Sequence, residues 1–187
     1  MPSNVADALS FIVGSIGQLY AYVLLLRLLL PWVRADFHNP IAQAILKITS
    51  PLVVPLRRVI PAIGRIDTAT LLVLFFVLYL TLFLIGLIMQ FAVGATFLAI
   101  SSALYIPMLL LRLYFFLVIV RVILSWVAPG GYNPAVALIG MLTDPVLRPF
   151  RRLIPPLGGF DVSPIVVMIL IGALIRLMRG LIPFAAM

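Results

Sequence analysis

The sequence predicts an all-α membrane protein in which four transmembrane helices form two parallel tandem repeats, and three observations lead to this prediction. First, 65% of the 187 residues are hydrophobic and only 10% are charged, whereas roughly 25% of the residues of a soluble domain are charged. Second, several uncharged apolar stretches reach the ~20 residues that a helix needs to cross a bilayer. Third, a polar segment rich in proline and arginine occurs twice with closely similar residues.

The first transmembrane helix is predicted at about residues 8–33, because residues 8–26 carry no charge and the apolar run continues through Trp32. The residues that precede this helix lack the basic region of a secretory signal peptide. We therefore expect the helix to be retained as a span.

The next uncharged stretch, residues 68–111, is too long for a single span. A turn near Gly94 is predicted to divide it into helices at about residues 69–92 and 98–127. Pro107 lies inside the second of these and is expected to kink it or to mark its start.

The fourth span is predicted at about residues 164–183. Ser163 is a suitable N-cap for it, and Pro164 would occupy the first helical position, where its missing N–H is not needed. The chain then divides into two repeats, residues 1–93 and 94–187, each with two spans. An even number of spans gives both repeats the same orientation, related by an axis along the membrane normal.

Internal duplication follows from a gap-free shift that brings Arg27–Leu71 onto Arg121–Ile165. The identical residues are mostly Arg, Trp, Asn, Pro, Gly and Asp rather than Leu, so they do not arise from apolar composition. In each repeat the first span ends with a tryptophan, Trp32 or Trp126, that we expect at the headgroup level. An Asn-Pro pair then caps a short amphipathic helix that we expect in the interface plane, interrupted at Pro51 or Pro145. The capping residues are Asn39 and Asn133.

Most basic residues lie in two loops, residues 34–67 and 128–163. The positive-inside rule places both loops in the cytoplasm and both chain termini outside. The net charge of +8 is explained by this bias and by anionic headgroups, so no nucleic-acid partner is expected. The chain has no cysteine and one histidine, and it lacks phosphate-loop, dinucleotide and nucleophile-elbow motifs. We therefore expect no metal, no cofactor and no enzymatic activity.

The doubled motif Thr-x-Pro-x-x-x-Pro-x-Arg-Arg-x-Ile-Pro, followed by Gly-x-x-Asp, resembles that of the YggT family. This family is also called YlmG in some bacteria and is related to plastid proteins. The resemblance covers most of the chain, and it implies a small multi-pass protein of the bacterial inner (plasma) membrane. It further implies a link to osmotic or salt stress and to cell-division genes in bacteria, and to maturation of a membrane cytochrome in plastids.

The arginine pairs are the first candidate site, since guanidinium groups make bidentate contacts with phosphate and carboxylate. They are predicted to bind anionic lipid headgroups or an acidic segment of a membrane protein partner. The alternative is that they only fix the topology of the loops. The residues concerned are Arg57, Arg58, Arg151 and Arg152, with Arg148 beside the second pair.

Asp67 and Asp161 come directly before the second span of each repeat. They are expected to cap those helices or to pair with the preceding arginines. Arg27 and Arg121 lie near the end of a span, where snorkelling to the interface competes with a functional role. Arg112 lies deeper and has no equivalent arginine in the first repeat.

These features predict a non-catalytic membrane scaffold, or an assembly or stress-adaptation factor, that presents two cytoplasmic Arg-Arg loops. The alternative is a component of ion or osmolyte transport. In that case the spans of one chain or of a homo-oligomer would line a path near Arg112 or Arg121.

Overall fold

The computed structural model describes residues 3–91, 93–127, 133–154 and 161–181, which form six α-helices. No β-strand occurs within these ranges, so the all-helical prediction is confirmed there. In chain order the helices are α1 (Ser3–Leu29), α2 (Pro40–Arg57), α3 (Thr68–Ile88), α4 (Ala95–Val127), α5 (Pro134–Leu153) and α6 (Ser163–Arg179).

Three helices, α1, α3 and α4, are long and apolar enough to cross a membrane. At 1.5 Å per residue they measure about 40, 32 and 50 Å, against about 30 Å of bilayer hydrocarbon. Helix α6 has 17 residues and carries Arg176 and Arg179 in its last turn. It is therefore shorter than a full span, and the predicted end of that span at residue 183 lies outside the described residues. The protein is a membrane protein, while the fourth span stays a prediction.

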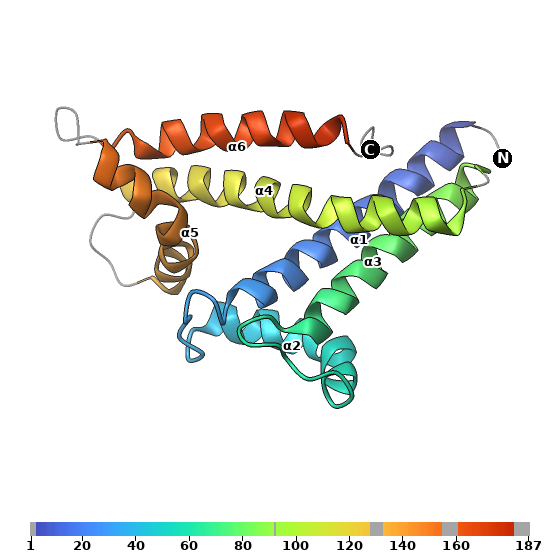
Figure 1. Cartoon of the computed structure of the whole chain (residues 1–187), viewed down its shortest axis with the longest axis horizontal. Helices are drawn as coiled ribbons and strands as arrows, with labels where there is room; N and C mark the ends of the chain where they lie inside the picture. Colours follow the sequence, from blue (N-terminus) through green and yellow to red (C-terminus); the bar gives the residue numbers. More distant parts are fainter. Residues whose placement is uncertain (1–2, 92, 128–132, 155–160, 182–187) are drawn as a thin grey trace.

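The helices form two antiparallel pairs, each with a bent helix across one end (Figure 1). Helix α3 returns alongside α1, and α2 lies at the end where α1 finishes and α3 begins. Helix α6 returns alongside α4, and α5 lies at the corresponding end of that pair. The pairs are joined because α4 packs against α3 and α2 meets α5.

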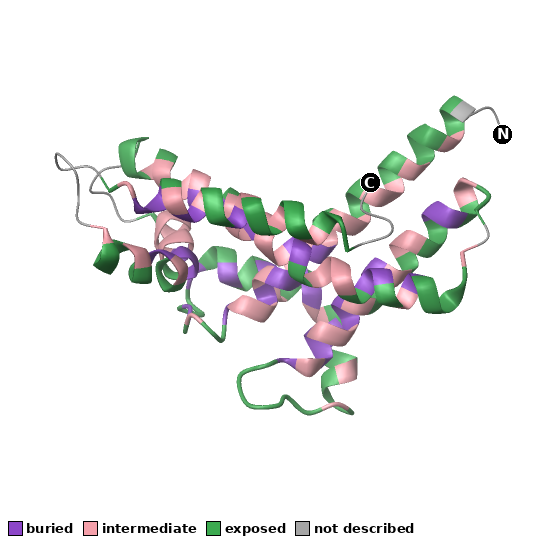
Figure 2. Cartoon of the chain, turned by 45° about the horizontal axis from the view of Figure 1, so that its top comes forward, coloured by how far each residue is buried: buried purple, intermediate pink, exposed green. Residues whose placement is uncertain are grey.

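Buried side chains concentrate where the helices cross, whereas the N-terminal end of α1 is largely exposed (Figure 2). One buried cluster joins α1, α2 and α3 to parts of α4 and α5, and it includes Leu24, Leu74 and Leu109. A smaller cluster joins α4, α5 and α6 around Val118 and Val167. The α3 surface outside the cluster is apolar as well, as expected for a helix that faces lipid. Because lipid is as apolar as leucine, close packing must hold these helices together.

Two helices end earlier than predicted. The regular part of helix α1 ends at Leu29 instead of residue 33, because Pro31 has no N–H to continue the helical hydrogen bonds. The chain closes the helix with a Schellman-type turn, in which the Ala35 N–H donates to the Leu30 carbonyl and Arg34 has φ +51°. Helix α3 ends at Ile88 instead of residue 92 through the same kind of turn, with Gln90 at φ +58°.

Helix α4 begins at Ala95 rather than at residue 98, and it stays continuous through Pro107. We call α2 and α5 the surface helices, since they correspond to the two predicted amphipathic helices. The prediction that Pro51 and Pro145 interrupt them is wrong, since α2 continues to Arg57 and α5 to Leu153. Both helices bend instead (Figure 1). The prolines of each helix, four residues apart, are exposed, so the hydrogen bonds that they remove fall on the outer face.

Close packing of α1 on α3 depends on Gly17. A Cβ at this position would overlap the Thr81 hydroxyl and methyl groups, whereas a Cβ at Gly14 would meet only Ile85 at 3.5 Å. We predict that Gly17→Ala lowers the free energy of unfolding by about 1–3 kcal/mol. Gly14→Ala is the matched control, and it should be neutral or stabilising by up to about 1 kcal/mol through helix propensity. Thermal unfolding in detergent measures both, and equal effects would contradict close approach at Gly17.

Candidate functional site: the surface helices and their arginines

The end of α1 is tied to the middle of α2 by Arg27. The guanidinium of Arg27 donates to the Thr49 hydroxyl at 2.8 Å, to the Leu46 carbonyl at 3.2 Å and to the Ser50 hydroxyl at 3.3 Å. Arg27 is only 5% exposed. No carboxylate of the described residues lies within ion-pair distance of it. The Arg27 cation is therefore bound by neutral oxygens of the surface helix, while snorkelling to the interface stays a prediction.

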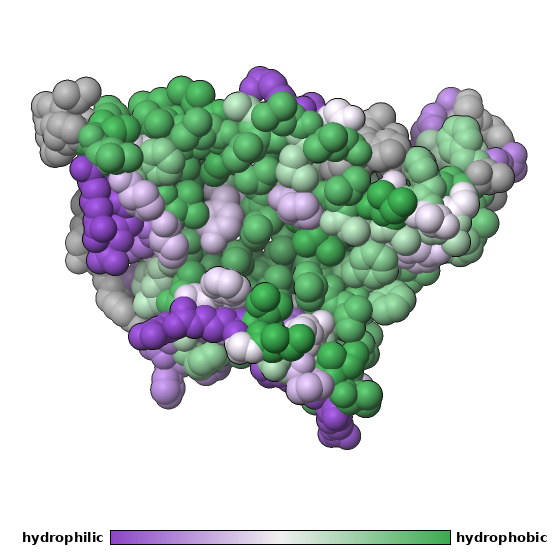
Figure 3. Space-filling view, viewed as in Figure 1, coloured by the Kyte–Doolittle hydropathy of each residue, from purple (hydrophilic) through white to green (hydrophobic). Residues whose placement is uncertain are grey.

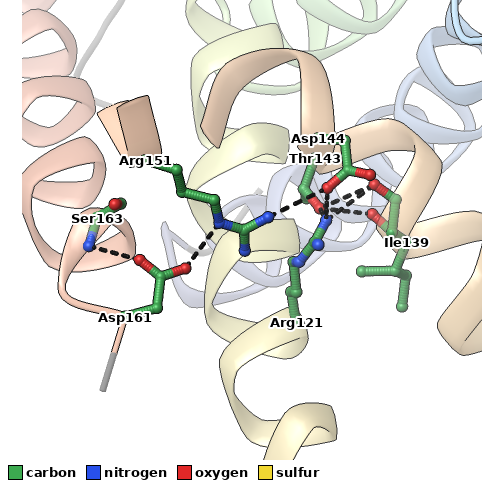
Figure 4. Close-up of polar contacts among 8 residues, drawn as sticks. Arg121, Ile139, Thr143, Asp144, Arg151, Asp161 and Ser163 are labelled. Carbon is green, nitrogen blue, oxygen red and sulfur yellow. Dashed lines mark hydrogen bonds and ion pairs between the residues drawn. The ribbon is translucent and has the colours of Figure 1, made fainter. Parts of the chain in front are cut away.

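Arg121 makes the equivalent contacts in the second half of the chain (Figure 4). Its guanidinium donates to the Thr143 hydroxyl at 2.6 Å and to the Gly140 carbonyl at 2.9 Å. It also forms an ion pair with Asp144 at 2.7 Å, where the first half has Ser50. We call this set of contacts, from Arg27 in one half and from Arg121 in the other, the arginine brace.

The brace acts where the surface helix bends. The threonine hydroxyl donates back to the carbonyl four residues earlier, Ile45 for Thr49 and Ile139 for Thr143, at 2.6 and 2.7 Å. Such back-bonding is associated with helix bending, and the proline two residues after each threonine bends the helix further. The arginine therefore supplies charge-assisted hydrogen bonds to the turn that the proline disturbs.

A second set of contacts closes each loop onto the following helix. The Asp67 carboxylate accepts from the Thr70 N–H and hydroxyl and so caps α3, and it lies 3.8 Å from the Arg57 guanidinium. In the second half Arg151 contacts Asp161 at 2.7 Å and Asp144 at 3.4 Å. The Arg of each pair that comes first in the sequence is thus engaged within the chain.

Asp161, and not Ser163, accepts the first backbone N–H of α6. The Ser163 N–H donates to the Asp161 carboxylate at 3.0 Å, and α6 begins at Ser163 itself, so the predicted Ser163 cap is wrong. Partial burial raises the pKa of Asp161, but hydrogen bonds from Arg151 and Ser163 outweigh this effect and hold the pKa below its ordinary value. The carboxylate therefore stays ionised and paired at neutral pH.

The two halves meet at the starts of their surface helices. The Asn39 carboxamide oxygen caps α2 by accepting from the Ile41 and Ala42 N–H groups. Its amide nitrogen donates to the Pro134 carbonyl, at the first residue of α5, at 2.8 Å. Asn133 caps α5 through the Ala135 N–H. Asn39 thus combines a local cap with a contact between the halves.

The other predicted residues are spread over the same end of the molecule. Arg58, Arg148 and Arg152 are exposed, and no ion pair within the described ranges involves them. Trp32 lies in the turn after α1, whereas Trp126 lies within α4, because Ser125 replaces the proline at that point. Polar residues gather over α5 and over the loops beside α2, while the α4 and α6 surface is mostly apolar, with a hydrophilic patch at the upper edge of the view (Figure 3).

Arg112 does not join this site. Its guanidinium donates to the Tyr105 hydroxyl at 3.2 Å and lies 5.7 Å from the centre of the same ring. Both residues belong to α4, so the contact leaves the arginine within its own helix. No group of three or more potential metal ligands occurs among the described residues.

Sequence reasoning gave no role to the two threonines of the brace or to Arg34. The signal for Thr49 and Thr143 was present, because each is identical in both halves and has the same spacing from its arginine. Arg34 gave no such signal, since the equivalent residue is Ala128.

The fold and the braces define a class: a multi-span membrane protein in which two similar units each hold a bent, basic helix across one end. The chain belongs to the CCB3/YggT family, whose family model matches residues 6–88 and again residues 100–182. The two matches suggest that the family unit is repeated, one copy falling in each predicted repeat.

The chain is similar to bacterial proteins that are named as uncharacterized and to a chloroplastic protein. An uncharacterized protein from Pseudomonas aeruginosa is 44% identical over 157 residues, covering 83% of this chain and 80% of the relative. The uncharacterized protein YggT of Escherichia coli K12 is 37% identical over 165 residues, covering 88% and 86%. The chloroplastic YlmG homolog protein 2 of Arabidopsis thaliana is 40% identical over 66 residues, which is 34% of this chain and 25% of the relative. The search of solved structures found no significant match.

The two asparagine caps give a matched test of the contact between the halves. We predict that Asn39→Ala costs about 2 kcal/mol of unfolding free energy, because it removes both a cap and a buried hydrogen bond. Asn133→Ala should cost about 1 kcal/mol, because among the described residues the Asn133 side chain makes only the cap bond to the Ala135 N–H. Asn39→Asp keeps the capping oxygen but not the donor, so it should fall between them. Chemical denaturation in mixed micelles measures the order, and a larger loss for Asn133→Ala would contradict it.

The braces differ in a way that substitution can measure. Thr49→Val removes the shortest hydrogen bond of a buried arginine that has no carboxylate partner, so we predict a loss of about 2–3 kcal/mol. Thr143→Val leaves Arg121 paired with Asp144, so its loss should be about 1 kcal/mol. Both valines preserve side-chain volume. Thermal unfolding of the two variants under one condition compares them, and equal losses would show that the Asp144 pair does not support Arg121.

Proposed function

We propose that this protein is a non-catalytic membrane scaffold or assembly factor. Its two basic surface helices bind anionic lipid headgroups and an acidic segment of a membrane protein partner. The observation that carries the proposal is the recurrence of the brace. In both halves an arginine from a long helix fixes the bend of a surface helix, and that helix ends beside a free, exposed arginine, Arg58 or Arg152. An arginine that is held in a fixed position in both halves is better suited to recognising a specific anionic group than to merely keeping a loop on one side of the membrane.

The proposed setting is the bacterial inner membrane, with four spans in two parallel repeats and both surface helices on the cytoplasmic side. The antiparallel pairing of α6 with α4 supports a fourth crossing. Arg176 and Arg179 would then lie at the outer interface, where long side chains snorkel. The concentration of Lys and Arg at the opposite end supports the orientation.

Transport is the second hypothesis. The polar side chains within the long helices support transport less well than the surface helices support a scaffold. A cavity lined by Gln18, Thr81 and Tyr105 holds about 50 Å³, which is room for a few water molecules. Arg112 contacts Tyr105 of its own helix. These features give a solute no evident route past Arg112 in one chain, and a homo-oligomer would have to supply it.

Charge reversal at the free arginines tests the scaffold. We predict that Arg58→Glu with Arg152→Glu abolishes capture of the specific membrane proteins that co-purify in mild detergent, while each single variant keeps part of it. Arg57 and Arg151 are left intact because their ion pairs support the fold. Quantitative mass spectrometry of the purified complexes measures the capture.

The matched control reverses two exposed basic residues that the other half lacks, Lys47→Glu with Arg65→Glu. The control changes the net charge by the same amount and should leave partner capture intact. An equal loss of capture in the control would show that the net charge, and not the position of the arginines, determines capture. Purified protein in liposomes should pass no ions or osmolytes, and a clear flux would favour transport instead.

A further inference from the structure

A groove of about 560 Å³ runs between the two halves on the basic end of the molecule. One wall is the turn after α1, with Trp32, Val33 and Arg34, and the other is the outward face of α5. On α5 the groove is apolar at Met141 and basic at Arg148 and Arg151. Its volume lies in the range of ligand sites, roughly 300–1,000 Å³.

The charges within the groove do not cancel. Asp144 is already paired with Arg121 at 2.7 Å and with Arg151 at 3.4 Å, and Arg151 is also paired with Asp161. These two carboxylates therefore balance two arginines. Arg34 and Arg148 are left exposed and without an ion pair among the described residues.

Arg34 and Arg148 are also the basic residues of this groove that the duplication does not explain. In the other half Ala128 corresponds to Arg34, and Val54 corresponds to Arg148. One residue comes from each half, and both line the same groove. Two unmatched cations that converge on one groove indicate a single site in each chain rather than one in each repeat.

The backbone conformation of Arg34 also supports a binding site in this groove. Arg34 holds the positive-φ position of the turn that closes α1, with φ +51°. Glycine is the usual residue there, and a side chain costs about 1 kcal/mol. Strained positions that keep a side chain are concentrated at binding sites.

We propose that this groove binds the phosphate of one anionic phospholipid headgroup, which Arg34 and Arg148 contact from opposite walls. Trp32 lines the groove and is half exposed, as expected for an aromatic ring at headgroup level, and Met141 offers an apolar surface to the start of an acyl chain. The inference rests on the proposed function in one respect: this end of the protein must lie at the membrane surface.

Native mass spectrometry of the detergent-solubilised protein tests the site by titration with phosphatidylglycerol and with phosphatidylcholine of the same chains. One phosphatidylglycerol should be retained per chain in preference to phosphatidylcholine. Arg34→Gly and Arg148→Gln should each weaken this retention about tenfold, since one charge-assisted contact is worth roughly 1.4 kcal/mol or more. Arg34→Gly should at the same time raise the melting temperature without lipid, because glycine relieves the backbone.

Gln90→Gly is the matched control, since Gln90 has φ +58° in the turn that closes α3, away from the groove. It should raise the melting temperature and leave lipid retention unchanged. Equal retention of both lipids, or undiminished retention in Arg34→Gly and Arg148→Gln, would overturn the proposal.

Displacement of the lipid by inorganic phosphate at equal concentration would assign the groove to a soluble anion. Loss of partner capture by these variants with lipid retention intact would assign it to a protein. Partner capture by Arg58→Glu with Arg152→Glu tests the scaffold separately, so a failure of the groove proposal leaves that test standing.

Discussion

The structure depends on one recurring interaction, the hydrogen bonding of an arginine near the end of a long helix to the bent turn of a surface helix. A guanidinium cannot lose its charge in a protein, so burial forces it to find acceptors. Arg27 and Arg121 find them in a threonine hydroxyl and a backbone carbonyl of the turn before the first proline. The brace thereby sets the angle at which α2 and α5 leave the long helices, and it fixes where their remaining arginines stand.

This constraint separates arginines that build the fold from arginines that make no ion pair among the described residues. Arg57 and Arg151 are held by the carboxylates at the starts of α3 and α6, so each Arg-Arg pair divides its work. The first member closes the loop, and the second faces outward with its hydrogen-bonding capacity unused within the described chain. The motif alone suggests substituting both arginines of a pair. Such a variant would not distinguish a loss of binding from a loss of folding.

Local chemistry was enough to predict much of this architecture. Apolar length gave three of the spans, and the Asn-Pro pairs marked the starts of α2 and α5 at Asn39 and Asn133. The continuation of both helices through Pro51 and Pro145 could not be predicted, because it requires the missing hydrogen bonds to face outward and a distant arginine to support the turn. The groove was equally hidden, since Arg34 and Arg148 lie far apart in the sequence and become neighbours of one cavity only when the halves pack.

The differences between the two halves follow from their different burial. Arg27 is almost fully buried and uses neutral oxygens, whereas the side chain of Arg121 is 23% exposed and pairs with Asp144. The side chain of Asp144 is 55% exposed, so its carboxylate pairs with Arg121 while it keeps much of its hydration, whereas the first half has Ser50 at this position. Asp144 also contacts Arg151 at 3.4 Å, whereas Arg148 on the same helix has no ion pair among the described residues. The two halves therefore use the same pair of residue types, an arginine and a threonine, to support the bend, and the more exposed half adds Asp144 to the contact.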